Sequence, residues 1–176
     1  MSLSIGSSCP DFDLPGTDGE NHSLASFAGA DVLVVIVSCN HCPYVVAYEE
    51  RIVYLSREYT GKGVRIVAIN ANDAVRYPDD GMPQMKERAR QRGFDFPYLR
   101  DDSQELARAL GARFTPEVFA FDRTRKLRYH GRIDDNHREP TSVRSHDLRN
   151  AIDALLNGRE PAVTETQAVG CSVKWR

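Results

Sequence analysis

The pattern of apolar and polar positions is dominated by one unbroken apolar run, Val-Leu-Val-Val-Ile-Val at residues 32–37. A run without polar alternation predicts a strand that is buried on both faces, as in the middle of a covered parallel sheet. The run leads directly into Cys-Asn-His-Cys at residues 39–42, and apolar residues then recur at helical spacing over residues 43–59. The sequence therefore predicts two cysteines between the end of a central strand and the start of a helix.

Further along the chain, strand and helix patterns alternate. A β-branched run predicts a second strand at residues 64–69. The remaining predicted elements are a helix at 82–92 ended by Gly93, a short strand at 96–99, a hairpin with strands at 118–121 and 127–131, and a last helix at about 142–157 that buries Leu148, Ile152, Leu155 and Leu156. A further helix ends at Leu110, with Asp102 as its N-cap and Glu105 completing a capping box.

This order of elements predicts an α/β fold, a three-layer sandwich in which a mixed central sheet carries helices on both faces. Helical crossovers make the first paired strands parallel, and the late hairpin adds antiparallel strands. Two short strands before Leu24 form an N-terminal β-hairpin. We expect one domain over residues 1–158, followed by a non-periodic C-terminal tail, residues 159–176, that carries Cys171.

Charge and composition narrow the class of protein. The 176 residues include 23 Lys and Arg against 25 Asp and Glu, a net charge of -2, so no global field attracts nucleic acid or an anionic membrane surface. No apolar run approaches the ~20 residues that span a bilayer. Because the first residues have neither a basic segment nor an apolar core, we expect a cytoplasmic protein. In that reducing compartment, a Cys-x-x-Cys indicates redox chemistry or metal binding rather than a structural disulfide.

The position of the two cysteines favours redox chemistry. The start of a helix carries partial positive charge and unpaired N–H groups, which stabilise a thiolate. We expect Cys39 to be the attacking thiol and Cys42 the resolving thiol. Two alternatives remain open, a pair of inert buried thiols and a metal site. A structural zinc site needs four ligands and no second cysteine pair exists, so no metal site is predicted.

Three segments resemble a known family. Residues 6–14 look like the redoxin opening G-x-x-A-P-D-F-x-L, residues 39–42 match the thioredoxin active-site motif, and residues 114–122 look like the cis-proline loop and the strand after it. The chain thus resembles the AhpC/TSA-type redoxins of the thioredoxin superfamily, which include peroxiredoxin-like proteins. The resemblance implies a thioredoxin-like fold, and it places Thr115 and cis-Pro116 against the cysteines, where they offer backbone groups to a substrate disulfide.

The chain also departs from this family. Ser38 stands where thioredoxins place tryptophan, and Leu33 stands where they bury a proton-handling aspartate. The peroxiredoxin pattern requires Thr or Ser three residues before the peroxidatic cysteine, but Cys39 occupies that place for Cys42, and Ile36 occupies it for Cys39. These departures weaken the peroxidase interpretation.

Other residues carry narrower hypotheses. His41 lies between the two cysteines and is expected to tune them by stabilising a thiolate, which makes the protein more oxidising. Cys171 is either a further resolving thiol or a free surface thiol. Cys9 replaces an alanine and is expected to be a small buried residue.

Glu117 and Asn70 are candidates for proton handling, because the family fold places both near the sulfurs. We expect the remaining histidines of the second half of the chain to lie on the surface, namely His130, His137 and His146.

These observations predict a thiol–disulfide oxidoreductase that uses a Cys39–Cys42 couple without a cofactor. A thiol-dependent peroxidase that passes through a sulfenic acid is the first alternative, and a protein that handles Cu(I) through the same thiols is the second. The predicted partners are a protein or small-molecule disulfide or thiol and a reductant of unknown identity, with no nucleic acid and no membrane. The sequence identifies neither the substrate nor the oligomeric state.

Overall fold

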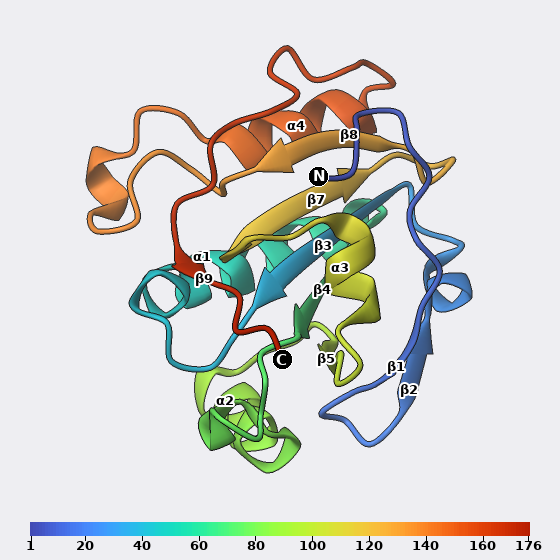
Figure 1. The fold of residues 1–176 in the computed structure, drawn as a ribbon. Coiled ribbons are helices and arrows are strands. Elements are labelled where there is room, and N and C mark those ends of the chain that lie inside the picture. The colour runs from blue at the N-terminus through green and yellow to red at the C-terminus, as the bar shows by residue number, and fades with distance from the viewer.

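The computed structural model describes all residues, 1–176, and is built around one five-stranded sheet in the order β5-β4-β3-β7-β8 (Figure 1). Its strands are β3 (Val32–Ser38), β4 (Val64–Asn70), β5 (Tyr98–Arg100), β7 (Glu117–Phe121) and β8 (Leu127–Gly131). The first three are parallel, β7 runs antiparallel to β3, and β8 runs antiparallel to β7. The sheet is therefore mixed, as predicted.

The central strand β3 is buried on both faces. Val32, Val34 and Ile36 point into one apolar cluster, and the alternate residues Leu33, Val35 and Val37 point into the other. All six side chains are 0% exposed. Successive residues of a strand face opposite sides of a sheet, so a strand with a core on each side must be apolar throughout.

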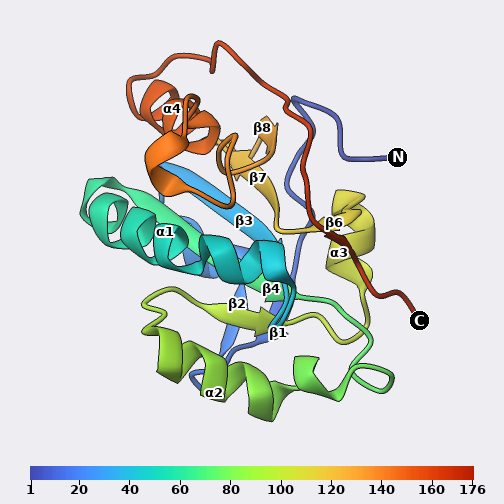
Figure 2. The same cartoon turned by 90° about the vertical axis from the view of Figure 1, so that its left-hand side faces the viewer.

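The two apolar clusters are covered by different layers (Figure 2). The helices α1 (Pro43–Tyr59), α2 (Met82–Arg92) and α4 (Asp147–Leu156) cover one face, and α3 (Glu105–Leu110) covers the other together with the N-terminal segment. The hairpin of β1 (Asp13–Pro15) and β2 (Asn21–Ser23) precedes the sheet. This arrangement confirms the predicted three-layer α/β sandwich with an N-terminal hairpin.

The predicted cap of α3 was wrong, because the N-cap residue is Gln104 and Glu105 is the first helical residue rather than part of a capping box. The carboxylate of Asp102 is bonded to Arg100 and Arg176, whereas fully buried Asp101 accepts the Ala107 N–H at 2.9 Å. Asp101 therefore supplies the side-chain acceptor for the first turn of α3.

Two other elements begin later than expected. The last helix starts at Asp147 because the Asp135 carboxylate accepts the N–H groups of Arg144 and Ser145 and holds them in a loop. Its expected core residues Leu155 and Leu156 are only partly buried. The short strand predicted at residues 96–99 is β5, Tyr98–Arg100.

The C-terminal residues run back across the domain to the region of the two cysteines. The short strand β9 (Cys171–Ser172) pairs antiparallel with β6 (Phe114–Thr115), and Val173 is buried in the same apolar cluster as α3. Cys171 thus lies beside the loop of Pro116. No helix of this fold has both the length and the apolar character needed to cross a membrane.

Candidate active site

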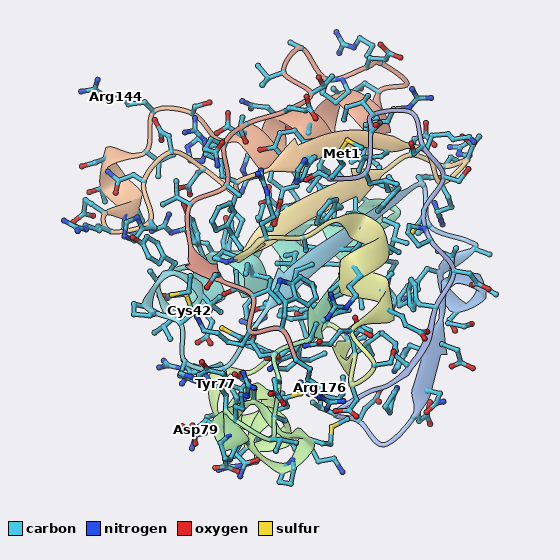
Figure 3. The ribbon with its side chains drawn as sticks, viewed as in Figure 1. Met1, Cys42, Tyr77, Asp79, Arg144 and Arg176 are labelled. Carbon is cyan, nitrogen blue, oxygen red and sulfur yellow. The ribbon has the colours of Figure 1, made fainter.

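The two cysteines occupy the junction between β3 and α1. Ser38, the last residue of β3, is in register with Asn70 of β4, and Cys39 follows it directly. Cys42 is the N-cap residue of α1, and Pro43 occupies the first turn, where its missing N–H leaves no intrahelical bond unmade. Both cysteines are buried, each 4% exposed. Figure 3 places Cys42 beside β9, on the opposite side of the view from the β1–β2 hairpin.

Thr115 connects the two sulfurs to the proline loop. The Thr115–Pro116 peptide bond is cis, as predicted. The Thr115 hydroxyl lies 3.5 Å from the Cys39 sulfur, and the Thr115 carbonyl oxygen lies 3.4 Å from the Cys42 sulfur, where it accepts a hydrogen bond when Cys42 is protonated. One residue therefore contacts both thiols, one through its side chain and one through its backbone.

The surroundings of the two sulfurs favour a thiolate on Cys42. The pKa of Cys42 is lowered to about 4, first because Cys39 donates a hydrogen bond to its sulfur and further because the Cys171 thiol and the backbone N–H groups of Val45 and Cys171 do the same; these donors outweigh the effect of burial. The same hydrogen bond between the two reduced cysteines raises the pKa of Cys39, and burial and the nearby Asp80 carboxylate raise it further. The pair therefore holds one proton, on Cys39, at neutral pH.

A buried polar network that was not predicted from the sequence supports the segment after Cys39. Asp80 is 0% exposed, and its carboxylate accepts the Asn40 backbone N–H at 2.9 Å, the Asn70 amide at 2.9 Å and the Asn72 amide at 3.0 Å. The Tyr98 hydroxyl donates to the Asn40 side chain at 2.8 Å. Nothing in the sequence distinguishes Asp80 from Asp79, which is exposed and lies at the outer edge of the molecule in Figure 3.

His41 lies next to this network. Its Nδ1 atom is 3.9 Å from the Asp80 carboxylate, and half of its side chain is exposed. The imidazole can therefore act on the thiols through the charge of Asp80. The tuning role of His41 stays a prediction.

The other two cysteines have different surroundings. Cys171, half-buried, packs against the cluster of Cys39, Cys42 and Val45. Burial raises the pKa of Cys9 to about 12, and this thiol packs in the apolar cluster on the α3 face. Cys9 is therefore the small buried residue that was expected.

Glu117 follows Pro116 directly and is fully buried. Burial alone would raise its pKa, but a hydrogen bond with His130 and the N–H groups of Arg113 and Phe114 outweigh burial and lower it. The His130 Nε2 and Glu117 Oε1 atoms are 2.6 Å apart. The expectation that His130 is a surface residue was wrong, because β8 directs its ring against Phe119 and Glu117.

The remaining predicted polar residues lie elsewhere. Asn70 donates to Asp80 rather than to a sulfur, so its proton-handling role stays a prediction together with that of Glu117. The ring of half-buried His137 packs on the ring of Tyr44, with the two ring centroids 4.4 Å apart, and His146 is exposed. No group of three or more His, Cys, Asp or Glu side chains is arranged to hold a metal ion.

Comparison with known proteins places this chain in a family. Residues 4–150 match the family model described as Redoxin. The thiol-disulfide oxidoreductase ResA of Geobacillus thermodenitrificans (strain NG80-2) is 26% identical over 129 residues, which cover 72% of this chain and 68% of that protein. A hypothetical protein of Sinorhizobium meliloti 1021 has a solved structure with a TM-score of 0.93 and 37% identity, covering 100% of this chain and 97% of that chain.

The thioredoxin domain of a thiol-disulfide oxidoreductase from Bacteroides vulgatus has a TM-score of 0.68 at 18% identity, covering 89% of this chain and 100% of that chain. At this identity the likeness concerns the fold alone. It confirms the predicted thioredoxin-like fold.

Proposed function

The chain belongs to the Redoxin family, and from this premise we propose that it is a thiol–disulfide oxidoreductase whose reacting couple is Cys39 and Cys42. The observation that carries the proposal is that Cys39 and Cys42 lie in one buried cluster at the start of α1 and both contact Thr115. Cys39 is also the first cause that lowers the pKa of Cys42, to about 4. Only a thiolate attacks a disulfide, so a cysteine that is ionised at neutral pH is suited to this reaction. The relative named as a thiol-disulfide oxidoreductase supports the same reaction class.

The two cysteines take the reverse of the roles expected from the sequence. In the proposed reaction the Cys42 thiolate attacks one sulfur of a substrate disulfide, a Cys42–substrate bond forms, and the other substrate sulfur leaves as a thiolate. Cys39 then attacks the Cys42 sulfur, and its proton passes to the second departing thiolate. The substrate disulfide is reduced to one thiolate, which takes a proton from solvent, and one thiol, and the protein couple is oxidised to the Cys39–Cys42 disulfide.

Thr115 and Asp80 act on Cys39 at different steps of this reaction. The Thr115 hydroxyl, 3.5 Å from the Cys39 sulfur, can donate to Cys39 as that thiol loses its proton. The Asp80 carboxylate opposes the charge on Cys39, which keeps the first thiolate on Cys42. The resulting difference between the two thiols gives the reaction its order.

The proposal is tested by treating the reduced protein with oxidised glutathione and mapping its disulfides by mass spectrometry. The expected product is an intramolecular Cys39–Cys42 disulfide with release of reduced glutathione. Cys42→Ser is expected to lose the fast reaction at neutral pH, because the remaining Cys39 thiol keeps its proton. Cys9→Ala, which removes a thiol that packs in the core away from the couple, is the matched control and is expected to react as the natural chain does.

Two results would count against the proposal. If Cys42→Ser reacts with oxidised glutathione as fast as the natural chain, Cys42 is not the attacking thiol. If hydrogen peroxide consumes the two thiols rapidly while oxidised glutathione leaves them reduced, the thiol peroxidase alternative replaces disulfide exchange.

A further inference from the structure

The final strand of the chain covers the backbone edge next to Pro116. In the β6–β9 pair, Thr115 is in register with Cys171 and Phe114 with Ser172, and the Val173 N–H donates to the Arg113 carbonyl at 3.0 Å. Figure 2 shows β6 next to the C-terminal segment on the α3 side of the sheet. The residue that contacts both reactive thiols, Thr115, is thus the residue that Cys171 faces.

The segment around Cys171 is held from both sides. Before it, the His130 N–H donates to the Thr164 carbonyl at 2.9 Å, and the Thr166 N–H donates back to the His130 carbonyl at 3.0 Å. After it, the Lys174 carbonyl accepts the Asp73 N–H at 2.8 Å and the Gln104 side-chain amide at 3.0 Å. Cys171 is therefore a thiol with a fixed position rather than one on a loose end.

This fixed position puts Cys171 in contact with Cys42. The thiol packs against the cluster of Cys39, Cys42 and Val45. Its S–H and its backbone N–H are among the donors that lower the pKa of Cys42. The pKa of Cys171 is raised to about 11, first by burial, then by the hydrogen bond to Cys42 and by the negative charge of the Cys42 thiolate. The last two causes end when Cys42 enters a disulfide, so Cys171 becomes easier to ionise at the step where a second thiolate is needed.

We propose that Cys171 is a third reacting thiol that competes with Cys39 for the Cys42 sulfur. In this step the Cys171 thiolate attacks Cys42 in the Cys39–Cys42 disulfide, a Cys42–Cys171 bond forms, and Cys39 leaves with the proton that Cys171 lost. No external oxidant is needed, because one disulfide is exchanged for another. The inference rests on the proposed function, since Cys42 must first be oxidised, and its product links the C-terminal strand covalently to the cysteine at the start of α1.

The test uses Cys39→Ser, which removes the competing thiol, and the matched variant Cys39→Ser/Cys171→Ser. Each full-length protein receives one glutathione on Cys42 from oxidised glutathione, the excess is removed, and loss of the adduct is followed by mass spectrometry. A thiol held in contact should act at a high effective concentration. We expect Cys39→Ser to release glutathione at least about tenfold faster than the double variant and to yield a monomer with a Cys42–Cys171 disulfide.

A second variant keeps all four cysteines. A side chain at Gly170 would overlap the Thr115 carbonyl oxygen, so Gly170→Ala displaces the strand without altering a thiol. In the Cys39→Ser background it should slow formation of the Cys42–Cys171 bond, whereas in the natural background the Cys39–Cys42 disulfide should still form.

The outcomes separate the two proposals. Equal adduct lifetimes in Cys39→Ser and the double variant, or a Cys171 disulfide only between two chains, overturn the role of Cys171 and leave the Cys39–Cys42 couple intact. If the natural chain forms no Cys39–Cys42 disulfide with oxidised glutathione, the proposed function fails and the inference fails with it.

Discussion

The Thr115 carbonyl oxygen lies 3.4 Å from the Cys42 sulfur, although the two residues are separated by 73 positions in the chain. The same residue places its hydroxyl near Cys39 and faces Cys171 across the β6–β9 pair. Three thiols therefore meet around one residue of the proline loop. The order in which these thiols ionise decides the chemistry of the site.

Cys39→Ala should raise the pKa of Cys42, because the alanine removes the largest of the hydrogen bonds that stabilise the Cys42 thiolate. Thiolate absorbance against pH measures the shift, and each pKa unit corresponds to ~1.4 kcal/mol. In the natural chain the first thiolate should appear near pH 4 and be absent from Cys42→Ser. Cys9 does not interfere, since its pKa of about 12 keeps it protonated throughout this range. An unchanged titration in Cys39→Ala would show that other donors set the pKa of Cys42.

Asp80→Asn should have two effects. It replaces an oxygen acceptor of the buried network by an amide group, so we expect a loss of about 1–3 kcal/mol in the free energy of unfolding. It also removes a charge that raises the pKa of Cys39, so that pKa should fall. Urea denaturation and thiolate absorbance measure the two effects. The control, Asp79→Asn, changes the exposed neighbour and should leave the free energy of unfolding and the pKa of Cys39 unchanged. If the two variants behave alike, Asp80 neither supports the site nor affects the pKa of Cys39.

His41→Ala should raise the pKa of Cys39 and make the reduction potential more negative. The imidazole lies 3.9 Å from the Asp80 carboxylate, and when protonated it offsets the charge that opposes a Cys39 thiolate. For a two-electron couple, ~30 mV corresponds to ~1.4 kcal/mol. Redox titration against glutathione measures the potential. If His41→Ala has the potential of the natural chain at every pH, the half-exposed imidazole plays no part in tuning the couple.

Glu117→Gln should destabilise the protein by about 1–3 kcal/mol near neutral pH, since an amide cannot accept all the bonds that the buried carboxylate receives. The folded-state pKa of Glu117 is lowered, so the carboxylate contributes stability above its unfolded pKa of about 4.3, and this contribution is lost as the pH falls through the lower folded value. Urea denaturation from neutral to acidic pH should therefore show the difference between the two proteins narrowing in acid.

The control for this variant is Glu165→Gln. Glu165 is exposed and forms a β-bridge with His130, the partner of Glu117. It should unfold like the natural chain at every pH. A gap between Glu117→Gln and the natural chain that does not change with pH would contradict the assigned ionisation of Glu117.

The sequence by itself determined the features that depend on neighbours along the chain. The apolar run of β3 and the cysteines at the start of α1 were predicted at their positions, because periodicity and residue spacing are local. The cis bond before Pro116 was expected from the family resemblance. From these local features the sandwich and the place of the couple follow.

The tertiary structure alone decided which similar residues became part of the site. Asp80 rather than Asp79 receives the Asn40 N–H, across a separation of 40 positions, and Asp101 rather than Asp102 accepts an N–H of the first turn of α3. His130 became the buried partner of Glu117, and Cys171 came to face Thr115. The acidity of Cys42 relative to Cys39 depends first on the local interaction between these two thiols. It depends further on burial, on Cys171 and on Asp80, which only folding brings to the sulfurs.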